Sequence, residues 1–190
     1  MKVIEKYDEE IKKAKEEGRT IIACMCNNEF KSLNYEVNES DNIELLDTSS
    51  KDGHRIYIRG ILYIMAKALN EVYPEALLSV NYQLSSAMFC KIDNMEITDE
   101  MIANVKARMQ EIINQNLEIR KVVMTKEEAE EFYSNEKTLR GIVQIDNTQK
   151  EGVSLYYCED YFNYFFGVMP VTTAYTDVFD VIKYGDGFLV

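Results

Sequence analysis

Hydrophobic and polar positions in the first 48 residues predict a short helix followed by extended segments. Residues 5–17 are expected to be helical, because Tyr7, Ile11 and Ala14 recur at three- and four-residue spacing and Gly18 ends the run. The β-branched run TIIACMC then leads through an Asn-Asn turn to EFKSLNYEV, and the polar turn NESDN leads to IELLD. We therefore expect a small unit of helix, hairpin and strand, residues 1–48.

A long helix is predicted next, after the polar segment SSKDGHR at residues 49–55, which is the expected domain boundary. The segment IRGILYIMAKALNEVY carries a wide apolar stripe, so the helix should be surrounded by other elements, and Pro74 ends it. The segments ALLSVNYQL and AMFCKI are typical of strands, joined by a short link at Ser85 and Ser86.

The rest of the chain alternates helices and extended segments. Thr98 is the expected cap of one helix, LEIRKVVM is a predicted strand, and Thr125 with Glu128 forms a capping box for the helix KEEAEEFYS. The segments GIVQID, GVSLYYCE, YFNYFFGVMP, VFDVIKY and GFLV are all expected to be extended. This order of elements predicts an α+β fold, with residues 54–190 as the second domain.

Composition narrows the classes of partner. Hydrophobic residues make up 46% and charged residues 28%, which is ordinary for a globular protein, but the net charge is -12. Duplex DNA and anionic membrane surfaces are therefore not expected as partners, because both are bound through neutralised phosphates. The amino terminus lacks the apolar segment of a signal peptide, and no run approaches a membrane span, so a cytoplasmic location is expected.

Candidate catalytic and metal-binding residues are few. The four cysteines, Cys24, Cys26, Cys90 and Cys158, form no C-x-x-C pair, and His54 is the single histidine. We expect thiols in a reducing cytosol rather than zinc ligands. No phosphate loop and no G-x-G-x-x-G motif occurs, and His54 lies in the polar linker. The prediction is no catalytic residue and no metal.

The segment LYYCEDYFNYFFG, residues 155–167, is unusually rich in aromatic residues. Its rings could form a stacking platform for a base or nucleoside. The favoured interpretation is that they occupy both faces of a strand, with some of them filling the core, because aromatic-rich strands are common. A mixed outcome, with phenylalanines inside and tyrosine hydroxyls lining a groove, is a third interpretation.

Longer segments carry a resemblance to known families. NNEFKSLNYEVNESDNIELLDTSSKDG resembles a TGS domain, a small ubiquitin-like module, in a reduced form. YIMAKALNEVYP and ITDEMIANVKARMQEIINQNLEIRKVVMTKEEAEEFY resemble the second, editing-type domain of threonyl-tRNA synthetase. CEDYFNYFFGVMPVTTAYTDVFDVIKYGDGFLV is similar to the end of that region in bacterial nucleoside kinases related to uridine kinase. The resemblance implies a TGS-like unit followed by an editing-like domain with an antiparallel sheet around a long helix.

The resemblance also implies a ligand site. The synthetase pattern has H-x-x-x-H on the long helix where this chain has Arg59 and Tyr63, and Cys158 matches a later cysteine without a following histidine. Loss of the imidazoles argues against a metal. By analogy, six residues should converge between the long helix and the carboxy-terminal strands: Arg59, Tyr63, Tyr82, Gln83, Cys158 and Tyr161. Arg59 would contact an anion, and the tyrosines would stack on the ligand or donate hydrogen bonds to it. Gln83 would form hydrogen bonds with polar groups of the ligand.

The resulting functional prediction is a non-catalytic ligand-binding or regulatory module of a uridine kinase-like protein. The kinase domain of that parent would use ATP and Mg. Expected partners are that kinase domain, a small nucleoside-like or RNA-derived ligand, and a second copy in a homodimer. Two alternatives stay open: a tRNA-editing-type hydrolase like that of threonyl-tRNA synthetase, and a protein-interaction or dimerisation domain.

Overall fold

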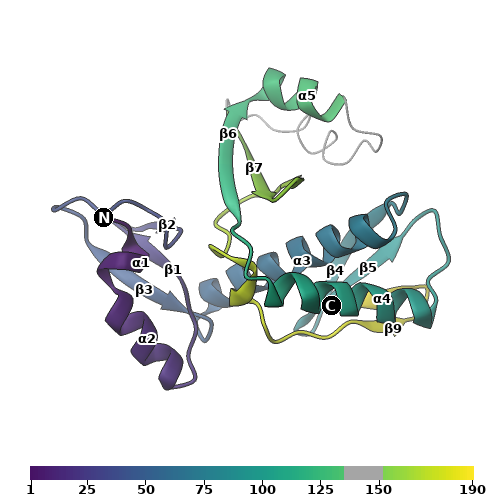
Figure 1. Ribbon diagram of the computed structural model, residues 1–190, viewed down its shortest axis with the longest axis horizontal. Helices are drawn as coiled ribbons and strands as arrows, with labels where there is room; N and C mark the ends of the chain where they lie inside the picture. The colour runs from purple at the N-terminus through teal and green to yellow at the C-terminus, as the bar shows by residue number, and fades with distance from the viewer. Residues whose placement is uncertain (135–151) are drawn as a thin grey trace.

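The computed structural model describes residues 1–134 and 152–190, whose helices and strands form three groups (Figure 1). The amino-terminal unit contains α1 (Val3–Lys6), α2 (Asp8–Glu16), β1 (Ile21–Cys26), β2 (Glu29–Lys31) and β3 (Ile43–Asp47). The central unit contains α3 (Lys51–Val72), β4 (Leu78–Leu84), β5 (Ala87–Ile92), α4 (Asp99–Asn114), β9 (Ile182–Tyr184) and β10 (Gly187–Leu189). The upper lobe contains β6 (Arg120–Thr125), α5 (Lys126–Ser134), β7 (Gly152–Cys158) and β8 (Tyr161–Tyr164).

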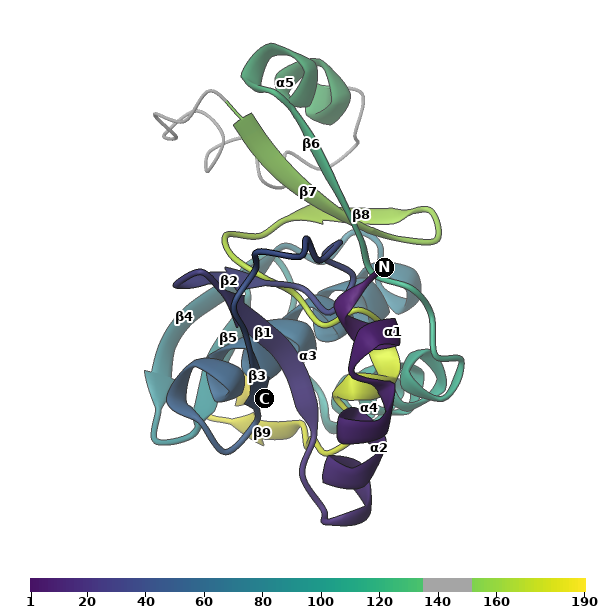
Figure 2. The same cartoon turned by 90° about the vertical axis from the view of Figure 1, so that its left-hand side faces the viewer.

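The amino-terminal unit is a three-stranded antiparallel sheet in the order β2-β1-β3, with α1 and α2 beside it (Figure 2). Its small core includes Val3, Ala14, Cys24 and Leu33. The predicted helix, hairpin and strand are confirmed in outline. The helix is interrupted at Tyr7, and the second strand is limited to three residues. The likeness of this unit to a TGS domain stays a prediction.

The central unit is built around α3, as the wide apolar stripe predicts. Buried side chains of α3 and α4 join those of the antiparallel sheet β4-β5-β10-β9 in the largest core, which includes Met65, Cys90, Met109 and Phe188. A short 3-10 turn, η1 (Thr173–Tyr175), contacts α4.

The helix α3 begins inside the segment expected to be a domain boundary. Ser50 caps it by accepting a hydrogen bond from the Gly53 amide at 3.0 Å. A Cβ added to Gly53 would lie 1.9 Å from the carbonyl oxygen of Asp47, so only glycine fits where the helix passes β3. The polar residues in this part of the chain therefore form the first turns of α3.

The upper lobe is a separate antiparallel sheet, β6-β7-β8, with α5 packed on it (Figure 1). Ala129, Tyr133, Val153, Leu155 and Phe162 form its own small core. The hairpin β7–β8 is the part of this lobe that lies next to α3 (Figure 2). The predicted extended segment GIVQID, residues 141–146, lies outside the described residues.

Antiparallel pairing of every strand pair in the described residues confirms the α+β class with antiparallel sheets. Helices in the described ranges are all too short or too polar to span a membrane.

Candidate functional site

Three polar residues of α3 face the hairpin β7–β8. Arg59, Tyr63 and Lys67 are four positions apart, which places them one above another on a single helix face. Each donates to backbone carbonyl oxygens in or just after the hairpin. We call these three residues the α3 ladder.

Arg59 contacts the chain just after β8. Its Nη1 donates to the carbonyl oxygen of Val168, and its guanidinium lies against Gly167. Gly167 has φ +102°, and a Cβ there would lie 3.0 Å from the guanidinium carbon. Burial lowers the pKa of Arg59 from its ordinary value. No carboxylate pairs with it among the described residues.

Tyr63 is fully buried under the hairpin. Its hydroxyl lies 2.9 Å from the carbonyl oxygen of Tyr156 and 3.3 Å from that of Tyr161, so one proton is shared between the two strands. Its ring packs edge-on against Tyr161 and Phe165, with centroids 5.4 and 5.7 Å away. Burial raises the pKa of Tyr63 far above its usual range. This phenol therefore holds the hairpin and is out of reach of a ligand.

Lys67 is also fully buried, although it carries a charge. Its Nζ lies 2.7 Å from Glu71 Oε1, 3.3 Å from Glu159 Oε2 and 3.4 Å from the carbonyl oxygen of Cys158. Burial works against the charged ammonium, but the hydrogen bonds and charges of Glu71 and Glu159 outweigh it and raise the pKa of Lys67. Lys67 therefore stays protonated and fixes the hairpin turn, in which Glu159 has φ +57°.

Beside the ladder lies a groove of about 440 Å³, bounded by α3, the start of β4 and strand β8. Its walls combine apolar side chains, aromatic rings and three polar side chains: Leu62, Ala66, Leu69, Asn70, Ala76, Leu78, Ser79, Val80, Tyr161, Asn163, Tyr164 and Phe165. We call this the aromatic groove. Its volume falls within the usual range for small-molecule sites.

Several hydrogen-bonding groups of the aromatic groove have no partner among residues 1–134 and 152–190. The side-chain amide of Asn70 makes no hydrogen bond within the described part of the chain. Strand β4 is an edge strand of its sheet, so alternate backbone groups along Leu78–Val80 point away from β5. Asn163 is partly engaged, since its Nδ2 donates to the Tyr161 hydroxyl at 3.0 Å. A ligand in the groove could therefore form hydrogen bonds with the side-chain amide of Asn70 and with backbone groups at the edge of β4.

The structure brings together four of the six candidate ligand residues. Arg59, Tyr63, Cys158 and Tyr161 all lie at the hairpin, but only Tyr161 lines the aromatic groove. Cys158 is buried, and burial raises the pKa of its thiol to about 11, which keeps the sulfur neutral.

The other two candidates lie on the exposed part of β4. Tyr82 stacks on Phe89 at 4.9 Å, and the Gln83 amide donates to the carbonyl oxygen of Ser85 at 2.8 Å. The predicted convergence of all six residues is therefore found only in part. Tyr82 and Gln83 lie near the end of β4, just before the chain turns at Ser85 into β5.

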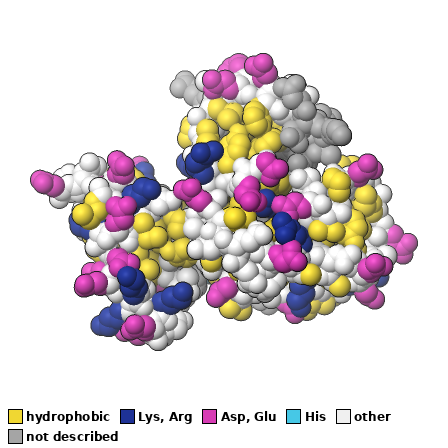
Figure 3. Space-filling model, in the orientation of Figure 1, with side chains coloured by type: hydrophobic (Ala, Val, Ile, Leu, Met, Phe, Trp, Pro, Cys, Tyr) yellow, Lys and Arg dark blue, Asp and Glu magenta, His cyan; other side chains and the backbone are white. Residues whose placement is uncertain are grey.

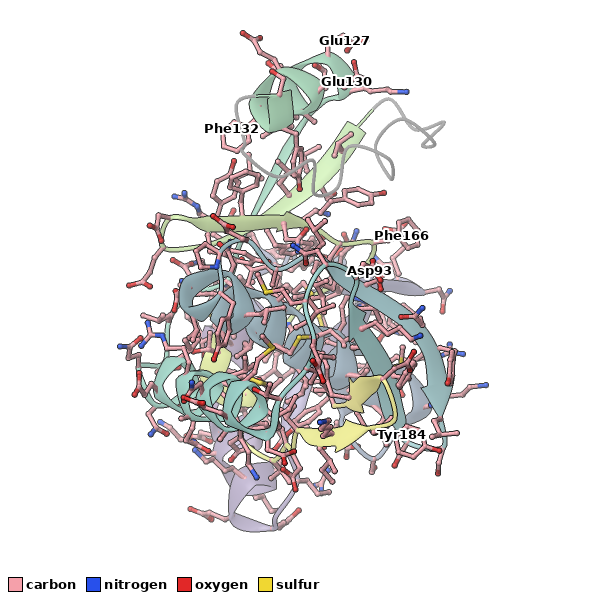
Figure 4. All side chains as sticks on the ribbon, turned by 90° about the vertical axis from the view of Figure 1, so that its right-hand side faces the viewer. Asp93, Glu127, Glu130, Phe132, Phe166 and Tyr184 are labelled. Atoms are coloured by element: carbon pink, nitrogen blue, oxygen red, sulfur yellow. The ribbon has the colours of Figure 1, made fainter. Side chains whose placement is uncertain are left out.

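Aromatic residues of the segment 155–167 do not sort by type as one interpretation expected. Tyr156, Tyr161 and Phe162 are buried, whereas Phe166 is 67% exposed and points outward (Figure 4). Lys67 and Asn70 were both missed from sequence. A lysine within the otherwise apolar run IMAKAL was the available signal for Lys67.

The described ranges contain no cluster of three or more histidine, cysteine, aspartate or glutamate residues that could hold a metal ion. Absence of a metal stays a prediction.

Fold and groove together define an α+β domain with a ligand-sized groove beside a buried polar ladder. No protein-family model matches the chain. It is 28% identical over 167 residues to a probable cytoplasmic threonine–tRNA ligase of Enterocytozoon bieneusi, covering 87% of this chain and 26% of that protein. It is 29% identical over 130 residues to the threonine–tRNA ligase of Thermobifida fusca, covering 68% of this chain and 20% of the ligase.

A third relative, the threonine–tRNA ligase of Streptomyces avermitilis, is 30% identical over 119 residues, or 62% of this chain and 18% of the ligase. The chain thus carries a threonyl-tRNA synthetase-like domain and spans about a fifth to a quarter of these relatives' length. The resemblance to threonyl-tRNA synthetase is confirmed at this level, and nothing in these matches indicates a uridine kinase parent.

Proposed function

We propose that this chain binds the aminoacylated terminal adenosine of a tRNA in the aromatic groove, as a module of the tRNA-editing type. The observation that carries the proposal is the groove itself, which has the volume of a small-molecule site on a chain similar to threonine–tRNA ligases. Similarity alone would be a weak argument for function, so the groove's chemistry has to fit the ligand.

That chemistry suits an aminoacyl-adenosine. Tyr164 and Phe165 are half-buried and line the groove, where their rings could stack on an adenine ring. The free amide of Asn70 can pair with ribose hydroxyls or an ester carbonyl, because an amide both donates and accepts. The unpaired edge of β4 adds backbone donors and acceptors opposite these rings.

Binding rather than hydrolysis fits the groups at the groove. An esterase needs an activated nucleophile or a positioned base. The Cys158 thiol is buried with a raised pKa, and the Lys67 ammonium is held protonated by two carboxylates. The two positions at which the resemblance to the synthetase expects histidines hold Arg59 and Tyr63, whose donors are already bonded to backbone carbonyls. We therefore propose a module that holds its ligand.

Calorimetry with a non-hydrolysable 3′-threonylamino-3′-deoxyadenosine tests the proposal, with adenosine and uridine as comparison ligands. We expect the threonyl analogue to bind more tightly than either nucleoside, and Asn70→Ala to weaken it. No heat from the analogue at millimolar concentration would contradict the proposal. A parallel deacylation assay with mischarged tRNA separates binding from hydrolysis, since turnover would show an editing enzyme instead.

An accessory role beside a nucleoside kinase rests only on the resemblance of module order. The same titration addresses it, because a uridine preference over the threonyl analogue would favour that parent. Neither ATP nor Mg has a proposed site in this chain.

An interaction role has one observation in its favour. Strand β4, LSVNYQL, is an uncharged edge strand on which Val80, Tyr82 and Leu84 are each at least 38% exposed. Edge strands of this kind pair readily with a second copy of the chain. Light scattering at high concentration would detect such a dimer, and Tyr82→Lys should dissociate it.

A further inference from the structure

A second cavity, of about 570 Å³, lies where the amino-terminal unit meets the central unit. The two units form separate bulges that join beside the start of α3 (Figures 1 and 3). Gly18, Thr20 and Thr48 line the cavity from the amino-terminal unit, and the rest of the lining comes from α3, from residues 177–180 and from the sheet of the central unit with its β4–β5 turn. Small-molecule sites often have this volume and lie between structural units. We call this the interface cavity.

One wall of the interface cavity is a face of α3. His54, Tyr57, Ile58 and Ile61 line the cavity, and their spacing of three and four residues places them on one side of the helix. The Tyr57 hydroxyl donates to the carbonyl oxygen of Val178 at 2.9 Å and accepts from the Val178 amide at 2.8 Å. These two hydrogen bonds hold the segment after η1 against the helix, so the cavity is formed before any ligand arrives.

The cavity presents apolar surface that the described chain leaves open. Beyond α3, its apolar lining is Val178, Phe179, Ile182, Leu189 and Val190. Val178 is 79% exposed and Ile182 is 56% exposed. Large aliphatic side chains that gather at the mouth of a cavity are typical of a binding site for a ligand with an apolar body.

The charged side chains in the lining are acidic. Asp177 and Asp180 line the interface cavity, and its lining contains no lysine or arginine. Asp180 pairs with Lys106 at 2.6 Å, whereas Asp177 makes no hydrogen bond or ion pair within residues 1–134 and 152–190. Burial raises the pKa of Tyr57, and the negative charge of Asp177 acts in the same direction, which places this carboxylate near the phenol. An unpaired carboxylate therefore lies beside the open apolar surface.

The nearest cations do not neutralise Asp177 by direct pairing. Lys15 and Arg19 line a smaller neighbouring cavity of about 220 Å³ together with Asp177. Neither of them forms an ion pair with that carboxylate, and the Arg19 guanidinium is bound by Glu17 at 2.7 Å and by Asp47 at 3.1 Å. The carboxylate of Asp177 is therefore available to a cation that enters the interface cavity.

We propose that the interface cavity binds a small amphipathic amine, with its apolar body against α3 and β9 and its ammonium group beside Asp177. The apolar walls favour any ligand of this shape, and the carboxylate favours the one that carries a positive charge. The proposal goes beyond the proposed function and does not depend on it, because the interface cavity and the aromatic groove share no lining residue.

Amide NMR shifts of the full chain at neutral pH test this with three probes that share a hexyl tail: n-hexylamine, 1-hexanol and heptanoate. We expect the amine to bind more tightly than the alcohol, and the carboxylate to bind most weakly. The shifts should fall on amides of the interface cavity, such as those of Val178 and Ile182, and not on Asn70 or Asn163 of the aromatic groove. Equal affinity of amine and carboxylate would overturn the proposal, as would shifts confined to the aromatic groove or no binding of the amine at millimolar concentration.

Asp177→Asn isolates the charge. It should weaken binding of the amine about threefold, the size of an exposed ion pair, and leave the alcohol unaffected. Asp160→Asn is the matched control, because Asp160 is an exposed aspartate outside the cavity that makes no ion pair within the described ranges. Equal losses of amine affinity in the two variants would show that Asp177 does not contact the ammonium group.

Ile182→Ser isolates the apolar wall, and Val178→Ser is a second variant of the same surface. Both side chains are more than half exposed, so both variants should fold, which urea denaturation checks. Each should weaken the amine and the alcohol alike, by about fivefold for Ile182→Ser. Unchanged affinities in both variants would exclude this wall as the binding surface.

Two further outcomes separate this proposal from others. Shifts of the same amides that grow with protein concentration, in the absence of a probe, would show that a second copy of the chain covers the surface, and the small-ligand proposal would be wrong. Threonylamino-adenosine should bind Asp177→Asn and the native chain equally well, because it is expected in the aromatic groove. Failure of one proposal is therefore distinguishable from failure of the other.

Discussion

Two polar surfaces meet at the β7–β8 hairpin, and they differ in whether their hydrogen bonds are satisfied. On the α3 ladder, Tyr63 and Lys67 are fully buried and each donates to carbonyl oxygens of the hairpin. In the aromatic groove, Asn70 and the edge of β4 have no partner in the described residues. Buried polar groups are almost always paired in native proteins, so the paired set has a structural role, whereas the accessible set is open to water or to a ligand.

The comparison explains why the residues singled out by resemblance are not the ones that face a ligand. Arg59 and Tyr63 occupy helix positions where the synthetase pattern has imidazoles, and here their donors hold the hairpin against α3. One helical turn further, Lys67 does the same with a buried charge. Polar residues at these positions thus stabilise the wall of the groove, and the groove's own lining comes from the next positions around the helix.

Removal of the Tyr63 side chain should have the largest effect on stability. Tyr63→Ala would empty a fully buried ring site and leave two carbonyl oxygens without their donor, for a loss of about 3–5 kcal/mol in the free energy of unfolding. Tyr63→Phe keeps the ring and should cost about 1 kcal/mol. Urea denaturation measures both.

Tyr164→Phe is the control for the hydroxyl, since the Tyr164 hydroxyl makes no hydrogen bond within the described ranges. Its stability should match that of the native chain. A Tyr63→Phe variant as stable as Tyr164→Phe would show that the shared hydrogen bond contributes nothing, and the ladder would lose its central contact.

Lys67→Met should come next, with a loss of about 2 kcal/mol. Breaking a buried ion pair usually costs more than this. Here Glu159 is half exposed, and Glu71 keeps its contact with Arg108 Nε at 2.5 Å, so both carboxylates remain solvated or paired. Lys106→Met, which breaks an exposed pair with Asp180, should cost at most about 0.5 kcal/mol in the same denaturation experiment. If Lys67→Met left the stability unchanged, the contacts of Lys67 with the hairpin would not stabilise the fold.

Low pH should weaken the ion pairs that Glu71 forms with Lys67 and Arg108. Burial raises the pKa of Glu71, but Lys67 and Arg108 outweigh it and hold the pKa below its ordinary value of 4.5. A carboxyl with a depressed folded-state pKa contributes stability above the unfolded pKa and loses it as pH falls through the folded one. The native chain should therefore lose stability below pH 4.5 more steeply than Glu71→Gln does. Parallel slopes in urea titrations from pH 5 to about pH 3 would exclude Glu71 as the cause.

Local chemistry in the sequence predicted the helices and their caps. Thr98 accepts from the Met101 amide at 3.1 Å, and Thr125 and Glu128 exchange the two hydrogen bonds of a capping box at 3.1 and 2.8 Å. These contacts span three residues, so a pattern of neighbours is enough to reveal them.

Contacts between residues far apart in the chain could not be predicted from the sequence. The bond between Lys67 and Cys158 joins residues 91 positions apart, and it exists only because the upper lobe places its hairpin over α3. The sequence marks Lys67 as a lysine within an apolar run but does not identify its partners. Tyr82 and Gln83 were assigned to the site by analogy and lie instead on the exposed end of β4, beyond the register shift between Val80 and Tyr82 and before the turn at Ser85. The groove therefore had to be found from the structure.

Asn70→Ala should combine the smallest loss of stability with the largest loss of ligand affinity. Asn70→Ala removes an amide that makes no hydrogen bond within the described residues, so the free energy of unfolding should change by less than about 0.5 kcal/mol. Binding of the threonylamino-adenosine analogue should weaken about tenfold, because one or two hydrogen bonds to the ligand are lost. Tyr63→Phe should show the opposite pattern, with a loss of stability and little change in affinity. If Asn70→Ala and Tyr63→Phe lost stability and affinity in the same proportion, the ladder and the groove would be one surface, and the distinction between structural and ligand-facing polar groups would fail.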